Sequence, residues 1–407
     1  MSGGWLLEPL LCFFSPSFWL DPKEKQIPFA SHGIRISRLQ IFPDESKLIP
    51  QKNLIHTLHP VSYIFSLLLL FKAEQIMQKT KIAVIGSGSW ASAIVKILLN
   101  NVNSVNWYIR EPEIIENLSK YGRNPLYLSS IEFDNSKLNL FDEPEKAINN
   151  CDIALFCVPA AFLHKTIGGM DSKILKDKLI ISAIKGIVPE YNTIIADYFK
   201  KHFNTDYTQF AIVSGPSHAE EVARERLTYL TVASQNTNAA EFISKLFDCR
   251  YIYTTTSRDI FGTEYAPVLK NIMALASGIC HSLGYGDNFQ AVLISNAIKE
   301  IRSFLDIVHP FERDISNSVY LGDLLVTAYS QYSRNRMFGA MIGKGYSVKA
   351  TQMEMQMVAE GYFAAKCITE INKPYGIYMP IVEAVYNILY QNASPAVEIE
   401  DLAKKLN

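Results

Sequence analysis

The chain has 407 residues, of which 48% are hydrophobic and 19% are charged, and its formal net charge is −1. A chain of this length indicates about two domains. The balanced charge gives no electrostatic reason to expect nucleic acid or an anionic membrane as a partner, so any anion must be bound by a local site.

Residues 1–76 differ in pattern from the rest of the chain. Their longest hydrophobic run, "VSYIFSLLLLF", is shorter than the roughly 18 apolar residues of a membrane span, and no basic region precedes it as in a signal peptide. Met77 opens "MQKTKIAVIG", which reads as the beginning of a domain. We expect residues 1–76 to be a disordered or non-native extension without a part in the chemistry. A membrane-associating leader is the alternative.

The six cysteines are scattered along the chain, and none forms a CxxC pair or a Cys/His cluster with zinc spacing. This usage favours a reduced, cytoplasmic protein over a disulfide scaffold. No metal site is expected.

Strand-like and helix-like segments alternate from Lys81 to about Thr256. The apolar runs are residues 81–86, 104–109, 152–159, 179–186, 210–216 and 228–234, with helical stretches such as 91–100 and 111–121 between them. Continuous apolar strands that alternate with helices indicate a buried, mostly parallel sheet.

After about residue 258 the pattern changes to long helical periodicity. Apolar residues recur at spacings of three and four in 264–284, 291–308, 349–372 and 380–391. We therefore predict an α/β Rossmann-type domain at residues 79–257 and an all-α domain at residues 258–407, with the active site between them.

The stretch "GSGSWA", residues 86–91, follows the first strand and opens a helix. Gly86 would make the tight turn, Gly88 would let a pyrophosphate approach the backbone, and Ala91 would let the helix pack on the strand. The helix N-terminus would offer free N–H groups to the phosphates. The loop predicts a bound dinucleotide.

The end of the second strand bears on which dinucleotide is bound. An acid is usual there for the ribose of NAD, but this chain has Arg110, which suits the 2′-phosphate of NADP. Glu111 follows directly, so NAD also stays open. The cofactor is predicted to be NADP or NAD.

Two further motifs follow strands of the predicted sheet. Lys185 ends the run "SAIKG", and the carboxyl end of a parallel strand faces the ligand crevice. "SGPSHAEE", residues 214–221, follows the next strand, and Ser217 is expected to cap a helix that begins near His218. A surface lysine and a plain strand-to-helix connection are the alternatives.

Lys270 is the only charged residue in "APVLKNIMALASGIC", residues 266–280. Burial on this apolar helix would lower the pKa of its amine from about 10.4 and suit it to proton transfer. Asp323 in "LGDLLVTAY" either pairs with Lys270 or caps a helix. "SRNR", residues 333–336, combines hydroxyl, guanidinium and amide groups and indicates a phosphate site or an exposed polar loop.

These motifs, in this order, resemble the NAD(P)-dependent glycerol-3-phosphate dehydrogenases over about residues 79–391. The most specific parts are "AIKG", "SGPSHAEE", "VLKN", "GDLLVTAYSQYSRNRMFG" and "VAEGY". The resemblance implies a Rossmann domain followed by a helical domain. It also implies reversible reduction of dihydroxyacetone phosphate to sn-glycerol 3-phosphate, for phospholipid synthesis.

The resemblance also implies roles for individual residues. Lys270 would exchange the proton with the substrate oxygen, assisted by Lys185 and Asp323. The residues implied in substrate binding are Lys185, Gly215, Ser217, Lys270, Asn271, Asp323, Ser333, Arg334 and Asn335. Those implied in cofactor binding are Gly86, Gly88, Ser89, Trp90, Arg110, Lys185, Ala219, Arg334, Val358 and Glu360. A homodimer is expected by analogy with other two-domain dehydrogenases.

One departure from the family pattern has no explanation in the sequence: Tyr320 stands before "LGDL" where a glycine is common. Two other functions remain as alternatives. A related hydroxyacid dehydrogenase or ketopantoate-type reductase would not need the phosphate site at "SRNR". A catalytically silent nucleotide-sensing module would be expected to have lost Lys270 or Asp323.

Overall fold

The computed structural model describes residues 75–355 and 359–406. The chain divides into two compact units, Met1–Lys79 and Thr80–Asn407, and the second unit is described below. The hydrophobic run at 61–71 and nearly all of the expected extension lie outside the described residues, as does Val358. The boundary between the two predicted domains at residues 257 and 258 stays a prediction.

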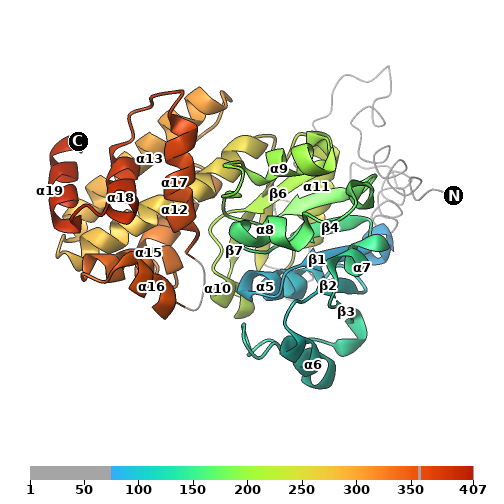
Figure 1. The fold of residues 1–407 in the computed structure, drawn as a ribbon. Coiled ribbons are helices and arrows are strands. Elements are labelled where there is room, and N and C mark those ends of the chain that lie inside the picture. Colours follow the sequence, from blue (N-terminus) through green and yellow to red (C-terminus); the bar gives the residue numbers. More distant parts are fainter. Residues whose placement is uncertain (1–74, 356–358, 407) are drawn as a thin grey trace, which may run out of the picture. The chain divides into compact units, whose positions relative to one another are not determined.

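An eight-stranded sheet forms the first half of this unit, within the residues that the structure describes (Figure 1). Its strand order is β3-β2-β1-β4-β5-β6-β7-β8, and every neighbouring pair is parallel except β6 and β7. The strands are β1 (Ile82–Ile85), β2 (Val105–Tyr108), β3 (Leu138–Phe141), β4 (Ile153–Phe156), β5 (Leu179–Ser182), β6 (Phe210–Ser214), β7 (Thr228–Ser234) and β8 (Ile252–Ser257). The order of the first six is that of a dinucleotide-binding sheet.

Helices connect the strands and then make up the second half of the unit (Figure 1). In the sheet half they are α5 (Ser89–Leu98), α6 (Pro112–Tyr121), α7 (Pro144–Asn149), α8 (Ala160–Ile167), α9 (Ile195–Phe203), α10 (Ala219–Ala223) and α11 (Thr237–Phe247). The second half contains α12 (Ile260–Ser282), α13 (Asp287–Val308), α14 (Asp323–Tyr329), α15 (Arg334–Gly343), α16 (Val348–Glu354), α17 (Glu360–Asn372), α18 (Pro380–Tyr390) and α19 (Pro395–Lys405). The predicted Rossmann-type and helical organisation is confirmed.

Two strands and one helix break were not predicted. β3 and β8 are edge strands whose residues are only partly buried, so they lack the continuous apolar run of an inner strand. The helical periodicity noted over 349–372 is divided between two helices. Met355 and Ala359 have extended backbones: α16 ends at Glu354, just before Met355, and α17 begins at Glu360, just after Ala359.

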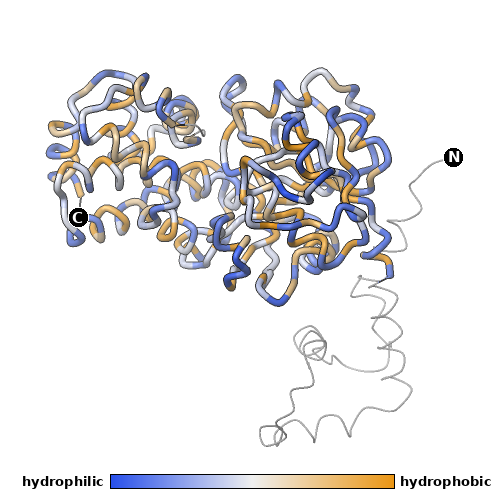
Figure 2. The backbone as a smooth tube through the Cα atoms, turned by 90° about the horizontal axis from the view of Figure 1, so that it is seen from below, coloured by the Kyte–Doolittle hydropathy of each residue, from blue (hydrophilic) through white to orange (hydrophobic). Residues whose placement is uncertain are grey.

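Burial on both faces explains why the inner strands are apolar throughout. Ile85 and Phe156 pack in one cluster with Leu163 of α8 and Phe199 of α9. Their strand neighbours Val84 and Leu155 point to the other face and are also fully buried. Figure 2 shows the hydrophobic segments mainly inside the unit and hydrophilic segments on its outer loops.

Helix α12 is the core of the second half. All its residues from Gly262 to Cys280 are buried, and α13, α14, α15, α17 and α18 pack around it. A helix that is apolar on every side is stable only in such a setting. α12 therefore carries its single central lysine, Lys270, into the interior.

Candidate functional site

The loop between β1 and α5 has the close approach that its glycines predict. Gly86 has φ +134°, and a Cβ there would lie 2.6 Å from the Cys157 carbonyl oxygen, so only glycine fits. The indole of Trp107 on β2 donates a hydrogen bond to the Gly86 carbonyl, 2.7 Å away. This hydrogen bond also holds the loop in place. It was not predicted from the sequence, although Trp107 belongs to a predicted strand.

The N-terminus of α5 fits the phosphates of a dinucleotide. Gly88 is its N-cap and makes no side-chain cap hydrogen bond, and a Cβ at Gly88 would meet nothing within 4 Å. Space is therefore open beside Gly88 at the N-terminus of α5, the part of a helix that suits a pyrophosphate. Ser89 begins the helix and is buried, and Trp90 follows it with an indole nitrogen that has no hydrogen-bond partner.

Arg110 and Glu111 lie together beside this loop. The Arg110 guanidinium is 2.6 Å from the Glu111 carboxylate, and the Arg110 side chain is 68% exposed. Glu111 also accepts a hydrogen bond from the Ser87 hydroxyl at 2.5 Å. The acid is therefore held against the glycine loop, while most of the Arg110 side chain stays exposed.

Lys270 and Asp323 form a buried ion pair, with Lys270 Nζ 2.5 Å from Asp323 Oδ1. Lys270 also donates to the hydroxyl of Thr327 at 2.9 Å, and that hydroxyl donates to the Asp323 carbonyl. Asp323 is the first residue of α14, yet its carboxylate faces Lys270, so pairing prevails over capping. Thr327 was missed in the sequence, although its spacing of four from Asp323 places both on one helix face.

Burial lowers the pKa of Lys270 to about 7. The Asp323 carboxylate opposes this shift and raises the pKa, while the nearby Lys185 ammonium lowers it. An amine with a pKa near neutrality can both donate and accept a proton under ordinary conditions.

Lys185 reaches the same ion pair from the sheet. Its Nζ lies 2.6 Å from the Gly215 carbonyl oxygen and 3.3 Å from Asp323 Oδ2. The prediction that Lys185 ends a strand was slightly wrong, because β5 stops at Ser182 and Lys185 lies in the loop beyond it. The Asn271 side chain donates to the Lys185 carbonyl at 2.9 Å, which fixes this loop on α12.

The predicted capping role of Ser217 is wrong. The N-cap of α10 is His218, without a side-chain cap bond, and the Ser217 hydroxyl donates instead to the Gly215 carbonyl. Ser217 Oγ is also 3.3 Å from Lys185 Nζ. Gly215 has φ +127°, and a Cβ there would approach the Tyr229 carbonyl oxygen. The motif thus turns its polar groups toward Lys185.

"SRNR" is the start of α15 and not an exposed loop. Ser333 is its buried N-cap and accepts a hydrogen bond from the Arg336 N–H at 3.2 Å. Asn335 is buried and accepts from the Gly361 N–H at 2.9 Å. The Arg334 side chain is half-buried; burial raises the pKa of both the Cys157 thiol and Glu360, and the nearby Arg334 guanidinium partly opposes that rise.

Glu360 joins the helical half to the sheet half. Its Oε1 accepts a hydrogen bond from the Ala160 N–H at 2.8 Å, and its Oε2 has no partner. Burial raises the pKa of Glu360 to about 7. Ala219 is the buried first residue of α10, which packs on α5. The structure thus brings Ala219 near the glycine loop's helix, while Arg334 lies near Glu360.

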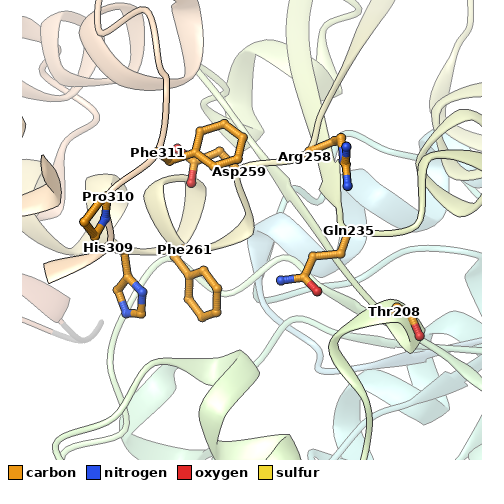
Figure 3. A pocket seen from close by; sticks show the side chains of 8 residues that line it. All are labelled: Thr208, Gln235, Arg258, Asp259, Phe261, His309, Pro310 and Phe311. Atoms are coloured by element: carbon orange, nitrogen blue, oxygen red, sulfur yellow. The ribbon is translucent and has the colours of Figure 1, made fainter.

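A pocket of about 620 Å³ lies away from these residues (Figure 3). It is lined by Thr208, Gln235, Arg258, Asp259, Phe261, His309, Pro310 and Phe311. Thr208 precedes β6, whereas Lys185 and Gly215 follow the ends of β5 and β6, so the pocket is at the opposite edge of the sheet. It contains no predicted site residue.

Two searches of the described ranges bear on other kinds of site. Across residues 75–355 and 359–406, no group of three or more His, Cys, Asp or Glu side chains is arranged to hold a metal ion. None of the helices in those ranges has the length and apolar character that crossing a bilayer requires.

The fold and the site together define a two-domain dehydrogenase. The features that define this class are the dinucleotide-type sheet, the helix N-terminus behind the glycine loop and the buried lysine near the carboxyl ends of the strands. Comparisons with known proteins make this class more specific. Residues 81–240 match the model "NAD-dependent glycerol-3-phosphate dehydrogenase N-terminus", and residues 259–400 match the corresponding C-terminus model. The chain belongs to the NAD-dependent glycerol-3-phosphate dehydrogenase family.

Individual relatives agree with the family assignment. A glycerol-3-phosphate dehydrogenase [NAD(P)+] of Clostridium botulinum (strain Eklund 17B / Type B) is 34% identical over 323 residues, covering 79% of this chain and 97% of that protein. The enzyme of the same name from Streptococcus agalactiae (strain NEM316) is 35% identical over 331 residues, covering 80% and 96%. The crystal structure of glycerol-3-phosphate dehydrogenase from Coxiella burnetii superposes with a TM-score of 0.74 at 25% identity, covering 80% and 98%.

Proposed function

We propose that this protein is an NAD(P)-dependent sn-glycerol-3-phosphate dehydrogenase that reversibly reduces dihydroxyacetone phosphate to sn-glycerol 3-phosphate. The observation that carries the proposal is the buried Lys270–Asp323 pair, joined by Lys185 at the carboxyl edge of a dinucleotide-type sheet. Relatives that match nearly the whole length of the second unit carry this name.

The proton chemistry follows from the charges around Lys270. When NAD(P)H is bound, its nicotinamide supplies the hydride. Negative charge then develops on the ketone oxygen, and the Lys270 ammonium stabilises that charge and donates the proton. Asp323 opposes the effect of burial, so the Lys270 pKa stays near neutrality and does not fall further. Lys185 adds a second positive charge that polarises the carbonyl.

Binding of the substrate's phosphate is assigned to the N-terminus of α15. Ser333, Arg334 and Asn335 form its first turn, where free N–H groups, the helix dipole and a guanidinium all favour an anion. We assign Gly215, Ser217 and Asn271 to the substrate pocket beside Lys185. The cofactor residues are those around the glycine loop together with Arg110, Ala219, Arg334 and Glu360.

The function is tested by the oxidation of NADPH, and separately NADH, by the purified full chain given dihydroxyacetone phosphate. Turnover should require the phosphate group, and Lys270→Ala should lower kcat by about 10²–10⁴-fold. Lys344→Ala, which removes an exposed lysine of the same helical half, should leave kcat unchanged. Turnover of 2-keto acids without turnover of dihydroxyacetone phosphate would favour a ketopantoate-type reductase instead.

We further propose a cytoplasmic role in glycerophospholipid synthesis and a homodimeric state. The product is the polar backbone of glycerophospholipids, and the described helices include no membrane span. Cell fractionation with and without residues 1–76 tests the location. Light scattering of the purified protein tests the homodimer, which a monomer mass would contradict.

A further inference from the structure

The carboxylate of Asp259 ties together three segments of the chain. Asp259 is the buried N-cap of α12 and accepts a hydrogen bond from the Gly262 N–H at 2.9 Å. It also accepts from Arg313 Nε at 2.8 Å and from the Tyr320 hydroxyl at 2.7 Å. Figure 3 shows Asp259 at the start of α12, next to Phe261 and Phe311. The Arg313 guanidinium compensates the negative charge of Asp259, so the Tyr320 hydroxyl is not needed to neutralise it.

Tyr320 connects this carboxylate to the backbone that carries Asp323. It belongs to the π-helical turn η7 (Ser318–Gly322), which leads directly into α14. The Asp323 N–H bonds to the carbonyls of Ser318 and Tyr320. Single π-helical turns are uncommon and often occur at functional sites. A movement of Tyr320 would therefore move the first residue of α14.

The two ends of this connection both lie on α12. Asp259 caps its first turn, and Lys270 lies further along the same helix. α12 thus contacts the η7–α14 segment at two polar points, Asp259 with Tyr320 and Lys270 with Asp323. Because α12 is buried along its length, it is a rigid reference for both contacts.

We propose that Tyr320 is a positioning residue: its hydroxyl, held by Asp259, fixes η7 and so orients the Asp323 carboxylate toward Lys270. The proposal rests on the proposed function, because that function assigns Asp323 and Lys270 to the reaction. It also explains why a large side chain stands before "LGDL". A glycine at this position could not reach Asp259.

The electrostatic consequence is measurable at Lys270. The charged or titratable groups that influence it are Asp323, Lys185 and, from α10, His218. Burial and Lys185 lower the Lys270 pKa, and Asp323 raises it. A displaced Asp323 carboxylate would oppose burial less, so the Lys270 pKa would fall below about 7.

The test is Tyr320→Phe in the full chain, with Tyr207→Phe as the matched control. The control also removes a hydroxyl that donates to an aspartate, Asp197, at 2.5 Å, but that aspartate belongs to α9 in the sheet half. In Tyr320→Phe, Asp259 keeps Arg313 and Gly262, so the fold should persist. Thermal unfolding of both variants measures how much stability each loses when its tyrosine hydroxyl is removed.

Three readouts go beyond stability. In Tyr320→Phe, kcat should fall by about 10- to 100-fold, as expected when a catalytic group is misplaced by about 1 Å, while KM for NADPH stays constant. The alkaline limb of the reduction pH profile should shift to lower pH. Hydrogen exchange of the amides at 318–329 should accelerate. Tyr207→Phe should change none of these three.

The outcomes separate the two proposals. If the wild-type chain does not turn over dihydroxyacetone phosphate, the proposed function fails. Hydrogen exchange and NMR titration of ¹³C-labelled Lys270 would then still test the positioning role of Tyr320, because neither needs turnover. If exchange, Lys270 titration and kcat match the wild type, the positioning role is overturned. Equal losses in both variants without a pH shift would show a merely structural hydroxyl and would also overturn it.

Discussion

Lys270 on α12 and Asp323 at the start of α14 lie 2.5 Å apart, Nζ to Oδ1, and both side chains are almost completely buried. Burial favours the neutral amine and the carboxylate favours the ammonium, so the two effects oppose each other at Lys270. Their balance leaves the Lys270 pKa at about 7, far below 10.5. Proton transfer in both directions of a reversible reaction needs such a value.

The first prediction is a pH dependence with opposite signs in the two directions. Reduction of dihydroxyacetone phosphate needs the Lys270 ammonium, so kcat/KM should be high below pH about 7 and fall above it. Oxidation of sn-glycerol 3-phosphate needs the neutral amine and should rise over the same range. Initial rates in both directions from pH 5.5 to 9 measure this. Two profiles that move in the same direction would contradict the assignment.

The second prediction concerns the cofactor. Arg110 is exposed, and its surface ion pair with Glu111 should contribute little to stability, so the main effect of Arg110→Ala should be the loss of a contact to the 2′-phosphate. KM for NADPH should rise about tenfold, the size of one charge-assisted hydrogen bond, and KM for NADH should stay within about twofold. Arg302→Ala, an equally exposed arginine paired with Asp306, is the control. Equal increases for both cofactors would argue against this role.

The third prediction separates capping from phosphate binding. Ser333→Ala and Ser347→Ala each remove a serine N-cap with a 3.2 Å hydrogen bond, at α15 and α16 respectively. Each should cost about 1 kcal/mol or less in the free energy of unfolding, measured in urea. Only Ser333→Ala should also raise KM for dihydroxyacetone phosphate. An unchanged KM would leave Ser333 with a structural role alone.

The fourth prediction tests the close packing of α12 and α15. A Cβ at Gly339 would overlap the Leu275 carbonyl, so Gly339→Ala should push the helices apart and cost about 1–3 kcal/mol. Gly169→Ala is the matched control, because a Cβ there meets nothing within 4 Å and should change stability by less than about 0.5 kcal/mol. Since α15 begins with the proposed phosphate site, Gly339→Ala should also raise KM for the substrate.

The fifth prediction is a pH dependence of stability from Glu300. Its buried carboxyl accepts from the Ile381 N–H at 2.7 Å, and burial raises its pKa to about 8. The native state therefore holds a proton that the unfolded state releases above about pH 4.5, so this contribution to stability is lost as pH rises through about 8.

Urea unfolding between pH 5 and 9 tests the Glu300 prediction. Glu300→Gln cannot ionise, so its free energy of unfolding should fall less with rising pH than that of the wild type. Glu354→Gln, which changes an exposed glutamate in α16, should keep the wild-type slope. Identical slopes for Glu300→Gln and wild type would contradict the prediction.

Local patterns in the chain were enough for the inner strands, the main helical stretches and their order. The inner strands are readable because both faces of each are buried, and the glycine loop because a tight turn needs Gly86. Burial of Lys270 was also predictable, because residues 266–280 of its helix contain no other charge. The edge strands β3 and β8 were not readable, since partly exposed strands carry mixed residues.

Contacts between distant segments required the folded chain. Asp323 could be a cap or an ion-pair partner by its sequence, and the packing of α14 on α12 selects the ion pair. Tyr320 had no explanation until Asp259 was found beside its hydroxyl. Glu360 likewise accepts a hydrogen bond from Ala160 at the N-terminus of α8, which lies 200 residues earlier in the chain. Hydrophobic periodicity and turn chemistry act over a few residues, whereas these partners are chosen by how helices pack, which depends on every side chain of the core at once.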